Sequence, residues 1–190
     1  MRAESLFVTN AAGTATLEVR SGTFTLNSGT LMVDKIMMTN PCGSFAHTGG
    51  TLVYGTAVLD PSRDDDNDGI PNGYEQSHGL DPLNPADANI DSDGDGFTNL
   101  QEFQAGTDAT NNASAFRITL IARTNDDVSV EWMTGTGKTN TLERSAAGGY
   151  SNNFTSVFTV TNTIGTTTNY LDVGAATNVP SQYCRVRLVP

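Results

Sequence analysis

The chain has 190 residues, of which 37% are hydrophobic, 7% aromatic and 16% charged, and its formal net charge is -11. So few aromatic residues predict thin hydrophobic cores in one to three small domains rather than one large core. No apolar stretch approaches the roughly 18 residues of a membrane span, and no basic stripe could neutralise phosphates, so we expect neither membrane insertion nor nucleic-acid binding. Abundant Thr, Gly, Asn, Ser and Val favour a mainly β fold.

The compartment is not fixed by the ends or the cysteines of the chain. The start, MRAESLFVTNAAG, has no apolar core of signal-peptide length. We therefore expect either a cytoplasmic protein or an excerpt of a longer chain whose signal lies upstream, and the acidic pattern described below favours the excerpt. The two cysteines, Cys42 and Cys184, are compatible with a disulfide and equally with two free buried thiols.

Residues 1–59 alternate apolar and polar side chains in short runs, which is typical of β-strands. The triplets Ser21-Gly22-Thr23, Ser28-Gly29-Thr30 and Gly49-Gly50-Thr51 recur at offsets of 7 and then 21 residues. A repeat of about 20 residues favours a β-helix or solenoid over an ordinary β-meander. The segment resembles the autotransporter-associated β-repeats of large bacterial surface proteins. The runs are TATLEV, GTFTL, GTLMV, KIMMT and GTLVYGTAV.

A solenoid buries its core only when about three or more repeats are stacked, and this segment supplies about two. We therefore expect one end to expose strand edges and apolar side chains. Two arrangements remain open at this point. The segment forms the last turns of a longer β-helix, or it stacks on another copy of itself.

Residues 60–114 carry most of the negative charge. Between Asp60 and Thr110, thirteen Asp and Glu accompany one basic residue, which gives a net charge of -12. Acidic blocks are often solvated tails, but here the acids fall at fixed spacings that a solvated tail does not need. At an offset of 27 the block contains two twelve-residue loops, 64–75 and 91–102. Both have acids at positions 1, 3, 5 and 12, Gly at position 6 and Asn at position 9.

This pattern predicts two calcium ions, because calcium takes six to eight oxygen ligands at about 2.4 Å. Side chains at positions 1, 3 and 5 supply carboxylates, and the glycine allows the sharp turn that follows. Position 7 offers its backbone carbonyl, position 9 an amide oxygen directly or through water, and position 12 two carboxylate oxygens. The predicted ligands are Asp64, Asp66, Asp68, Ile70, Asn72 and Glu75 in the first loop and Asp91, Asp93, Asp95, Phe97, Asn99 and Glu102 in the second.

Neither loop has the entering helix of an EF-hand, because prolines precede both loops. Short exiting helices are predicted over 72–78 and 99–105, each ended by a glycine, Gly79 or Gly106. The block therefore resembles the thrombospondin type 3 repeat and the dockerin module over residues 60–113. It lacks the paired cysteines of the former and the late-loop Ser or Thr of the latter, so the resemblance implies the ion sites and not cohesin binding.

The repeat continues beyond the loops, since Asp60 aligns with Asp87 and Asp81 with Asp108. Such residues either cap turns or complete the coordination of a neighbouring site. Turn capping is the more common role for aspartates in these places. Whether any of the four is a further ligand stays open.

Residues 115–190 return to short alternating strands separated by Gly, Asn and Thr turns, which predicts a small antiparallel β-sandwich. Trp132 is expected to anchor its core, and alternation places Arg185 and Arg187 in solvent. The segment is similar to the fibronectin type III-like sandwiches of secreted bacterial proteins. The predicted strands are FRITLIAR, VSVEWM, NTLERSA, SVFTVTN, NYLDV and YCRVRLV.

Catalysis is not expected from this sequence. His47 and His78 lie in no recognisable nucleophile or metal pattern, and no phosphate-binding or dinucleotide fingerprint occurs. The many carboxylates are accounted for by metal binding. Extracellular calcium modules typically bind at ~0.1–1 mM, a concentration that the cytosol does not reach. We therefore expect the protein in the extracellular space or on the cell surface.

The leading hypothesis is a calcium-rigidified joint of an adhesin, surface layer or filament, which associates with itself or with neighbouring domains of the same protein. An alternative is a module that binds polysaccharide through aromatic side chains. An exposed coplanar row of these aromatics favours that alternative, and their burial favours the structural role. Another alternative is an attachment or sorting module of a larger secreted enzyme. The aromatic candidates are Tyr150, Phe154, Phe158, Tyr170 and Tyr183.

Overall fold

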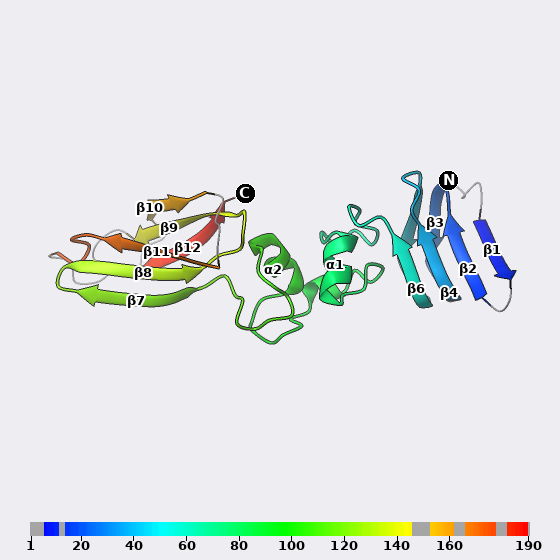
Figure 1. Ribbon diagram of the computed structural model, residues 1–190, viewed down its shortest axis with the longest axis horizontal. Helices are drawn as coiled ribbons and strands as arrows, with labels where there is room; N and C mark the ends of the chain where they lie inside the picture. The colour runs from blue at the N-terminus through cyan, green and yellow to red at the C-terminus, as the bar shows by residue number, and fades with distance from the viewer. Residues whose placement is uncertain (1–5, 12–13, 146–152, 162–165, 178–181, 190) are drawn as a thin grey trace. The chain divides into compact units, whose positions relative to one another are not determined.

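The computed structural model describes residues 6–11, 14–145, 153–161, 166–177 and 182–189 (Figure 1). The chain divides into two compact units, Met1–Ile90 and Asp91–Pro190. The boundary lies between the two acidic loops, so each loop shares a unit with one set of strands. The division into segments 1–59, 60–114 and 115–190 stays a prediction.

Five of the described strands of the first unit form a parallel stack, which we call the β-stack (residues 14–59). Strands β2, β4 and β6 pair in parallel, as do β3 and β5, while β1 pairs antiparallel with β2. Parallel pairing of these strands agrees with the stacked arrangement that the sequence favoured and differs from the antiparallel pairing of a β-meander. The elements of this unit are β1 (Leu6–Ala11), β2 (Thr14–Val19), β3 (Gly22–Leu26), β4 (Thr30–Met38), β5 (Gly43–His47), β6 (Thr51–Leu59), α1 (Asn72–His78) and the 3₁₀ turn η1 (Asp87–Asn89).

The stacking offset is 21 residues between β3 and β5 and between β4 and β6, as the triplets predicted, and it is 19 residues between β2 and β4. Thr30 lies opposite Thr51, and Gly22 lies opposite Gly43. The Thr51 N–H also donates to the Gly29 carbonyl at 2.8 Å. The offset of 7 is different, because it separates the triplets that begin at Ser21 and Ser28, which lie where β3 and β4 begin within one turn of the stack. Two runs predicted as separate strands, GTLMV and KIMMT, form the single strand β4, and β1 and β5 were not predicted from the sequence.

Close stacking leaves no room for side chains at some corners of the β-stack. A Cβ built on Gly43 would lie 2.1 Å from the Val19 carbonyl oxygen. The core beneath consists of buried apolar side chains alternating with outward-facing ones, as the sequence pattern predicted. Its members are Leu17, Val19, Leu26, Val33, Ile36, Met38, Phe45, Leu59 and Leu83. The last of these comes from the acidic segment and not from a strand.

Substituting Gly43→Ala is therefore expected to destabilise the β-stack. The new methyl group must displace backbone, and overpacking of this kind costs about 1–3 kcal/mol. Urea unfolding followed by far-UV circular dichroism measures the loss. Cys42→Ala, at the neighbouring exposed position, is the control and should leave the midpoint unchanged; equal midpoints for the two variants would contradict the proposed close contact.

The second unit contains two antiparallel three-stranded sheets, in the orders β11-β8-β7 and β10-β9-β12. Each predicted strand has a counterpart, which confirms the mainly β fold with antiparallel sheets in this part. Trp132 is fully buried in one core cluster with Val130 of the same strand and Leu142 of the next strand, and it donates from Nε1 to the Asn140 Oδ1 at 2.9 Å. The elements are α2 (Asn99–Ala105), β7 (Ile118–Thr124), β8 (Asp127–Met133), β9 (Thr139–Ser145), β10 (Phe154–Val160), β11 (Thr167–Asp172) and β12 (Cys184–Val189).

The two arginines of β12 face solvent as alternation predicted, and both also form ion pairs with Glu143. Arg185 and Arg187 donate to the two oxygens of Glu143 on β9 at 2.7 and 3.1 Å. These hydrogen bonds lower the pKa of Glu143 below its usual value. Because each arginine side chain is half exposed, the pairs align β9 with β12 and add modestly to stability.

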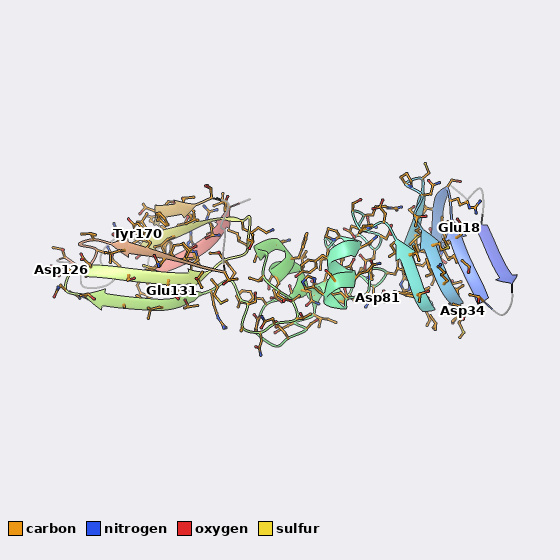
Figure 2. The ribbon with its side chains drawn as sticks, viewed as in Figure 1. Glu18, Asp34, Asp81, Asp126, Glu131 and Tyr170 are labelled. Atoms are coloured by element: carbon orange, nitrogen blue, oxygen red, sulfur yellow. The ribbon has the colours of Figure 1, made fainter. Side chains whose placement is uncertain are left out.

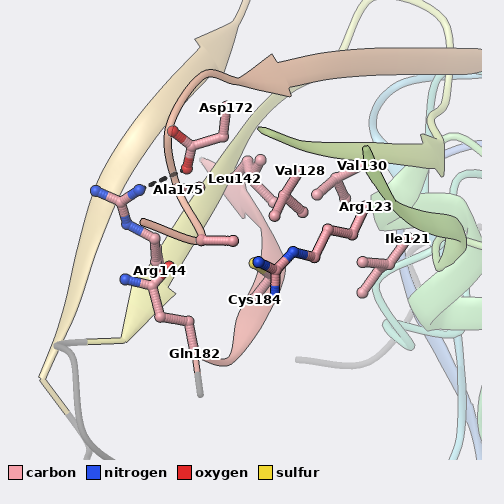
Figure 3. A pocket seen from close by; sticks show the side chains of 11 residues that line it. Ile121, Arg123, Val128, Val130, Leu142, Arg144, Asp172, Ala175, Gln182 and Cys184 are labelled. Atoms are coloured by element: carbon pink, nitrogen blue, oxygen red, sulfur yellow. Dashed lines mark hydrogen bonds and ion pairs between the residues drawn. The ribbon is translucent and has the colours of Figure 1, made fainter. Parts of the chain in front are cut away.

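A small hollow lies among the strands of the second unit (Figure 3). The Arg144–Asp172 ion pair, with an N–O distance of 2.6 Å, closes one side. Burial raises the pKa of the Cys184 thiol in this hollow, so that thiol is not activated as a nucleophile. Cys42 and Cys184 are both free, and Cys42 is exposed rather than buried. Within the described ranges, no helix has the length and apolar character needed to span a membrane.

Candidate metal centres

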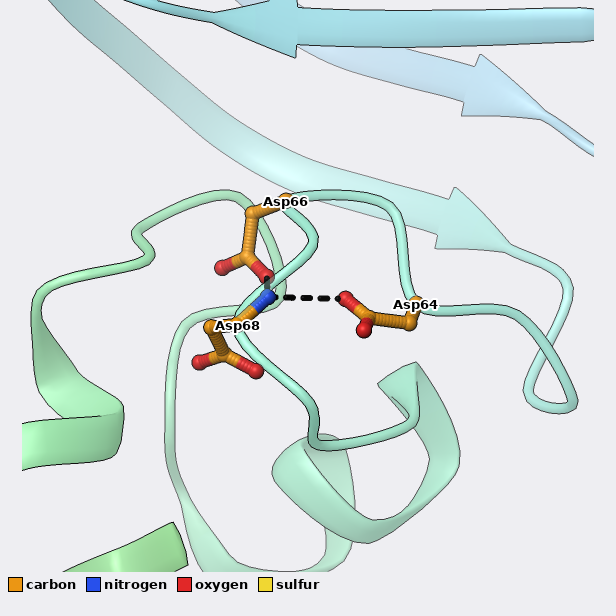
Figure 4. Close-up of side chains that lie close together, drawn as sticks. All are labelled: Asp64, Asp66 and Asp68. Carbon is orange, nitrogen blue, oxygen red and sulfur yellow. Dashed lines mark hydrogen bonds between the residues drawn. The ribbon is translucent and has the colours of Figure 1, made fainter.

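The first acidic loop gathers its carboxylates by hydrogen bonds to its own backbone (Figure 4). Asp64 accepts from the N–H groups of Asp68 and Gly69 at 3.2 and 3.0 Å, and Asp68 accepts from Ile70 at 2.7 Å. Gly69 has a φ of 96°, which favours glycine at this turn. As a result, Asp64, Asp66 and Asp68 each place a carboxylate oxygen within 4.8 Å of the others.

The second loop repeats this network at the same spacing. Asp91 accepts from Asp95 and Gly96 at 3.2 and 2.9 Å, and Asp95 accepts from Phe97 at 2.8 Å. Gly96 has a φ of 99°. Asp91, Asp93 and Asp95 again bring one oxygen each within 4.8 Å. Residues that lie 27 positions apart in the two loops therefore make the same hydrogen bonds.

Both predicted helices begin and end where the sequence indicated. Helix α1 covers Asn72–His78 and α2 covers Asn99–Ala105, and Gly79 and Gly106 end them with φ of 71° and 72°. The second helix has a full capping box, in which Thr98 accepts from the Gln101 N–H and Gln101 accepts from the Thr98 N–H. These short helices fix the position of the glutamate that ends each loop.

The glutamates at position 12 are buried and face the aspartates. Glu75 is 0% and Glu102 1% exposed. Neither carboxylate has a hydrogen-bond partner within the part of the chain that the structure describes. Burying an ionised carboxylate without a partner is costly, so each of these glutamates is either protonated or paired with a cation. Hard oxygen ligands from aspartate and glutamate fit calcium.

Burial next to other carboxylates also raises the pKa values of acidic groups in the metal-free loops. Burial, followed by the charges of Asp66 and Asp68, raises the pKa of Glu75 to about 9. Burial and the charges of Asp93 and Asp95 raise the pKa of Glu102 to about 7. Asp66 is affected in the same way by burial and by Asp68, with its pKa raised to about 7. A bound divalent cation would remove this penalty.

The predicted position-9 ligands are placed differently from the aspartates. The Asn72 side chain accepts from the Asp65 N–H at 3.1 Å and donates to the Asp65 carboxylate at 2.8 Å and the Asp60 carbonyl at 2.9 Å. The Asn72 side chain therefore holds Asp65 and the backbone of Asp60 in place by hydrogen bonds. Asn99 is buried at the start of α2, and the Ile70 side chain is fully buried while that of Phe97 is half-buried. Ligation by these four residues stays a prediction, as does ligation by the aspartates and glutamates of the two loops.

The aspartates beyond the loops cap turns, as the more common role suggested. Asp60 accepts from the Ser62 N–H at 3.0 Å. Asp81 accepts from Leu83 and Asp108 from Thr110, both at 3.1 Å. Asp87 also approaches the first site, because its carboxylate lies within 4.8 Å of those of Asp68 and Glu75. The sequence alignment at offset 27 had marked Asp87 and left its role open.

Comparison with known proteins agrees with this geometry. Residues 64–85 and 91–112 match the family model of the bacterial TSP3 repeat. No curated protein and no solved structure matches the chain. The resemblances of the flanking strands to autotransporter repeats and to fibronectin type III-like sandwiches therefore stay predictions. TSP3 repeats are structural calcium-binding repeats that occur in extracellular proteins. The acidic centre of this chain thus consists of two calcium-binding structural repeats of the bacterial TSP3 type.

Proposed function

We propose that this chain is a non-catalytic structural segment of an extracellular or cell-surface protein, rigidified by two calcium ions. The observation that carries the proposal is the pair of buried glutamates, Glu75 and Glu102, whose carboxylates lack hydrogen-bond partners among the described residues. One ion per loop compensates each of them. An adhesin, a surface layer or a filament is the setting in which such a rigid joint is useful.

The way each loop joins its strands supports a mechanical role. In the first unit, Leu83 from the repeat is buried in the β-stack core. In the second unit, Lys138 from the turn before β9 donates to the Phe103 carbonyl of α2 at 3.3 Å, and its ammonium lies 5.7 Å from the Phe103 ring centre. Each repeat is thus seated on the β-structure of its own unit. When calcium orders a loop, the connection between that repeat and the strands of its own unit therefore becomes more rigid.

The aromatic side chains of the second unit favour the structural role over polysaccharide binding. Phe158 and Tyr170 stack on each other with ring centres 4.6 Å apart, and Phe158 meets Trp132 edge to face. Phe154 lies under the Arg185 guanidinium. Tyr183 is 45% exposed, and Tyr150 lies outside the described residues. Phe154, Phe158 and Tyr170 therefore pack inward or against side chains, and Tyr183 is the one exposed candidate among the described residues, so these aromatics form no exposed row.

Calcium titration with the full chain tests the proposal. We expect isothermal titration calorimetry to give two ions per chain, with the melting temperature rising as calcium is added. Magnesium at the same concentration should have a smaller effect, because it dehydrates reluctantly and needs near-octahedral geometry. A melting temperature that responds to neither calcium nor chelator would contradict the proposal.

Self-association is expected to use an exposed apolar row of the β-stack. Met32 on β4 and Val53 on β6 lie opposite each other and are 69% and 44% exposed. Met32→Glu should reduce the size of the calcium-dependent assembly measured by light scattering, because a charge on this row opposes burial against a second copy. Val173→Glu, at an equally exposed position of the second unit, is the control. A wild-type chain that stays monomeric with calcium would contradict self-association.

A further inference from the structure

The two repeats share one turn beyond their helices, which is closed by different residues. The Asp81 N–H donates to Asp87 Oδ2 at 2.8 Å. At the equivalent place 27 residues on, the Asp108 N–H donates to Ser114 Oγ at 3.1 Å. A hydroxyl therefore closes this turn as a carboxylate does. The turn itself does not explain why the first repeat has an aspartate.

The aspartate differs from the serine in what else it reaches. Carboxylate oxygens of Asp87, Asp68 and Glu75 lie within 4.8 Å of one another. Among the described residues of the second repeat, the loop aspartates Asp91, Asp93 and Asp95 form a group like that of Asp64, Asp66 and Asp68, but no group includes Glu102 as the first repeat's includes Glu75. Glu75 is fully buried, and both of its oxygens lack a hydrogen-bond partner among the described residues. Three carboxylates this close, one of them fully buried, indicate a shared cation.

The same turn is bound to the β-stack. Asp81, which is labelled in Figure 2, accepts a hydrogen bond from the hydroxyl of Tyr54 on β6. Leu83, two residues on, is 1% exposed and belongs to the β-stack core. A ring nitrogen of His47, at the end of β5, lies 3.4 Å from the Leu83 carbonyl oxygen.

The residues before the loop reach the other end of β5. Arg63 donates to the Gly43 carbonyl at 2.6 Å and pairs with Asp65 at 2.7 Å. Strand β5 is an outer strand, since its two-stranded sheet contains β3 and β5 alone among the described residues. Arg63 and Leu83 therefore cover the two ends of this strand, where a further strand of the stack would otherwise lie.

We propose that Asp87 is a further ligand of the first calcium site, and that through it the first repeat is a calcium-dependent cap on the β-stack. Asp87 lies outside both matched repeats, 64–85 and 91–112. With the cation bound, Asp87 holds the Asp81 turn, which keeps Tyr54 hydrogen-bonded and Leu83 in the core. Without the cation, repulsion among Asp68, Glu75 and Asp87 loosens this turn. The inference rests on the proposed calcium function.

The test is Asp87→Ser in the full chain, which copies the turn of the second repeat. Calcium affinity at the first site should fall roughly 10-fold to 100-fold, the range seen when groups supporting a metal site are removed. Amide hydrogen exchange followed by mass spectrometry gives the second readout. In the wild type, calcium should slow exchange in 79–90 and in β6; in the variant, saturating calcium should protect loop 64–75 without slowing β6. Ser114→Ala is the matched control and should leave β6 unchanged.

Tyr54→Phe tests the capping of the β-stack separately from calcium binding, because Tyr54 is not a proposed calcium ligand. It should keep both calcium affinities and lose part of the calcium-induced protection of β6. It also decides the question if Asp87→Ser does not fold. A wild-type chain that binds no calcium overturns the proposed function itself. A wild-type chain that binds two ions, with Asp87→Ser equal to it in affinity or Tyr54→Phe equal to it in β6 protection, overturns this inference alone.

Discussion

Replacing Glu75 or Glu102 by Gln is expected to remove the calcium-induced stabilisation of the corresponding unit. At a free calcium concentration of about 100 times the dissociation constant, a bound ion adds ~2.7 kcal/mol to the free energy of unfolding. Glutamine has nearly the same shape but cannot offer two anionic oxygens. In a chain of this size each kcal/mol corresponds to about 2–4 °C in melting temperature. Each variant should therefore lose a shift of roughly 5–10 °C.

The same substitutions should act in the opposite direction without metal. Both carboxylates are buried, and folding the metal-free chain requires each to be desolvated or protonated. Glutamine removes that cost, so Glu75→Gln should melt higher than the wild type in chelator and lower in calcium. Calorimetry in the two conditions measures both signs. Glu131→Gln, at a half-buried glutamate on β8 that belongs to neither loop (Figure 2), is the control. A variant that is destabilised equally in both conditions would show that the glutamate has only a packing role.

The metal-free chain is expected to lose stability as the pH rises from about 5 to 8. The folded-state pKa is raised from 4.5 to about 9 for Glu75 and from 4.5 to about 7 for Glu102. Between the unfolded and folded values, the folded chain holds more protons, so the free energy of unfolding falls as pH increases. A difference of even one unit in effective pKa corresponds to about 1.4 kcal/mol. Saturating calcium should flatten or reverse the trend, because the ion binds the ionised carboxylates.

Melting curves at four pH values, with metal-free protein and with saturating calcium, measure this effect. Calcium addition near pH 7 should also release protons, which unbuffered titration detects. The double variant Glu75→Gln, Glu102→Gln should show a much smaller pH slope. A metal-free melting temperature that rises between pH 5 and 8 would mean that these carboxylates are ionised and compensated within the protein itself.

Much of the metal site was readable from the sequence, because its geometry is local. Each loop is twelve residues long, and the hydrogen bonds that gather its aspartates join residues two to five positions apart, as from Gly69 to Asp64. The helix bounds and their glycine ends follow from the same short-range rules. The 21-residue stacking offset was also visible, because residues that stack in a parallel solenoid recur at a fixed period. Local order and periodicity are properties that a sequence carries directly.

Only the tertiary structure decided what the repeats are attached to. Leu83 looks like a loop residue between two prolines, yet it is buried in the β-stack core. Strand β5 has no clear alternation and is ordered by pairing with β3, 21 residues earlier. The different surroundings of Asp87 and Ser114 also depend on chain folding. Contacts between residues far apart in sequence depend on shape and burial, which no single segment specifies. The sequence by itself therefore determined the calcium loops, and the fold determined which carboxylates and strands those loops hold together.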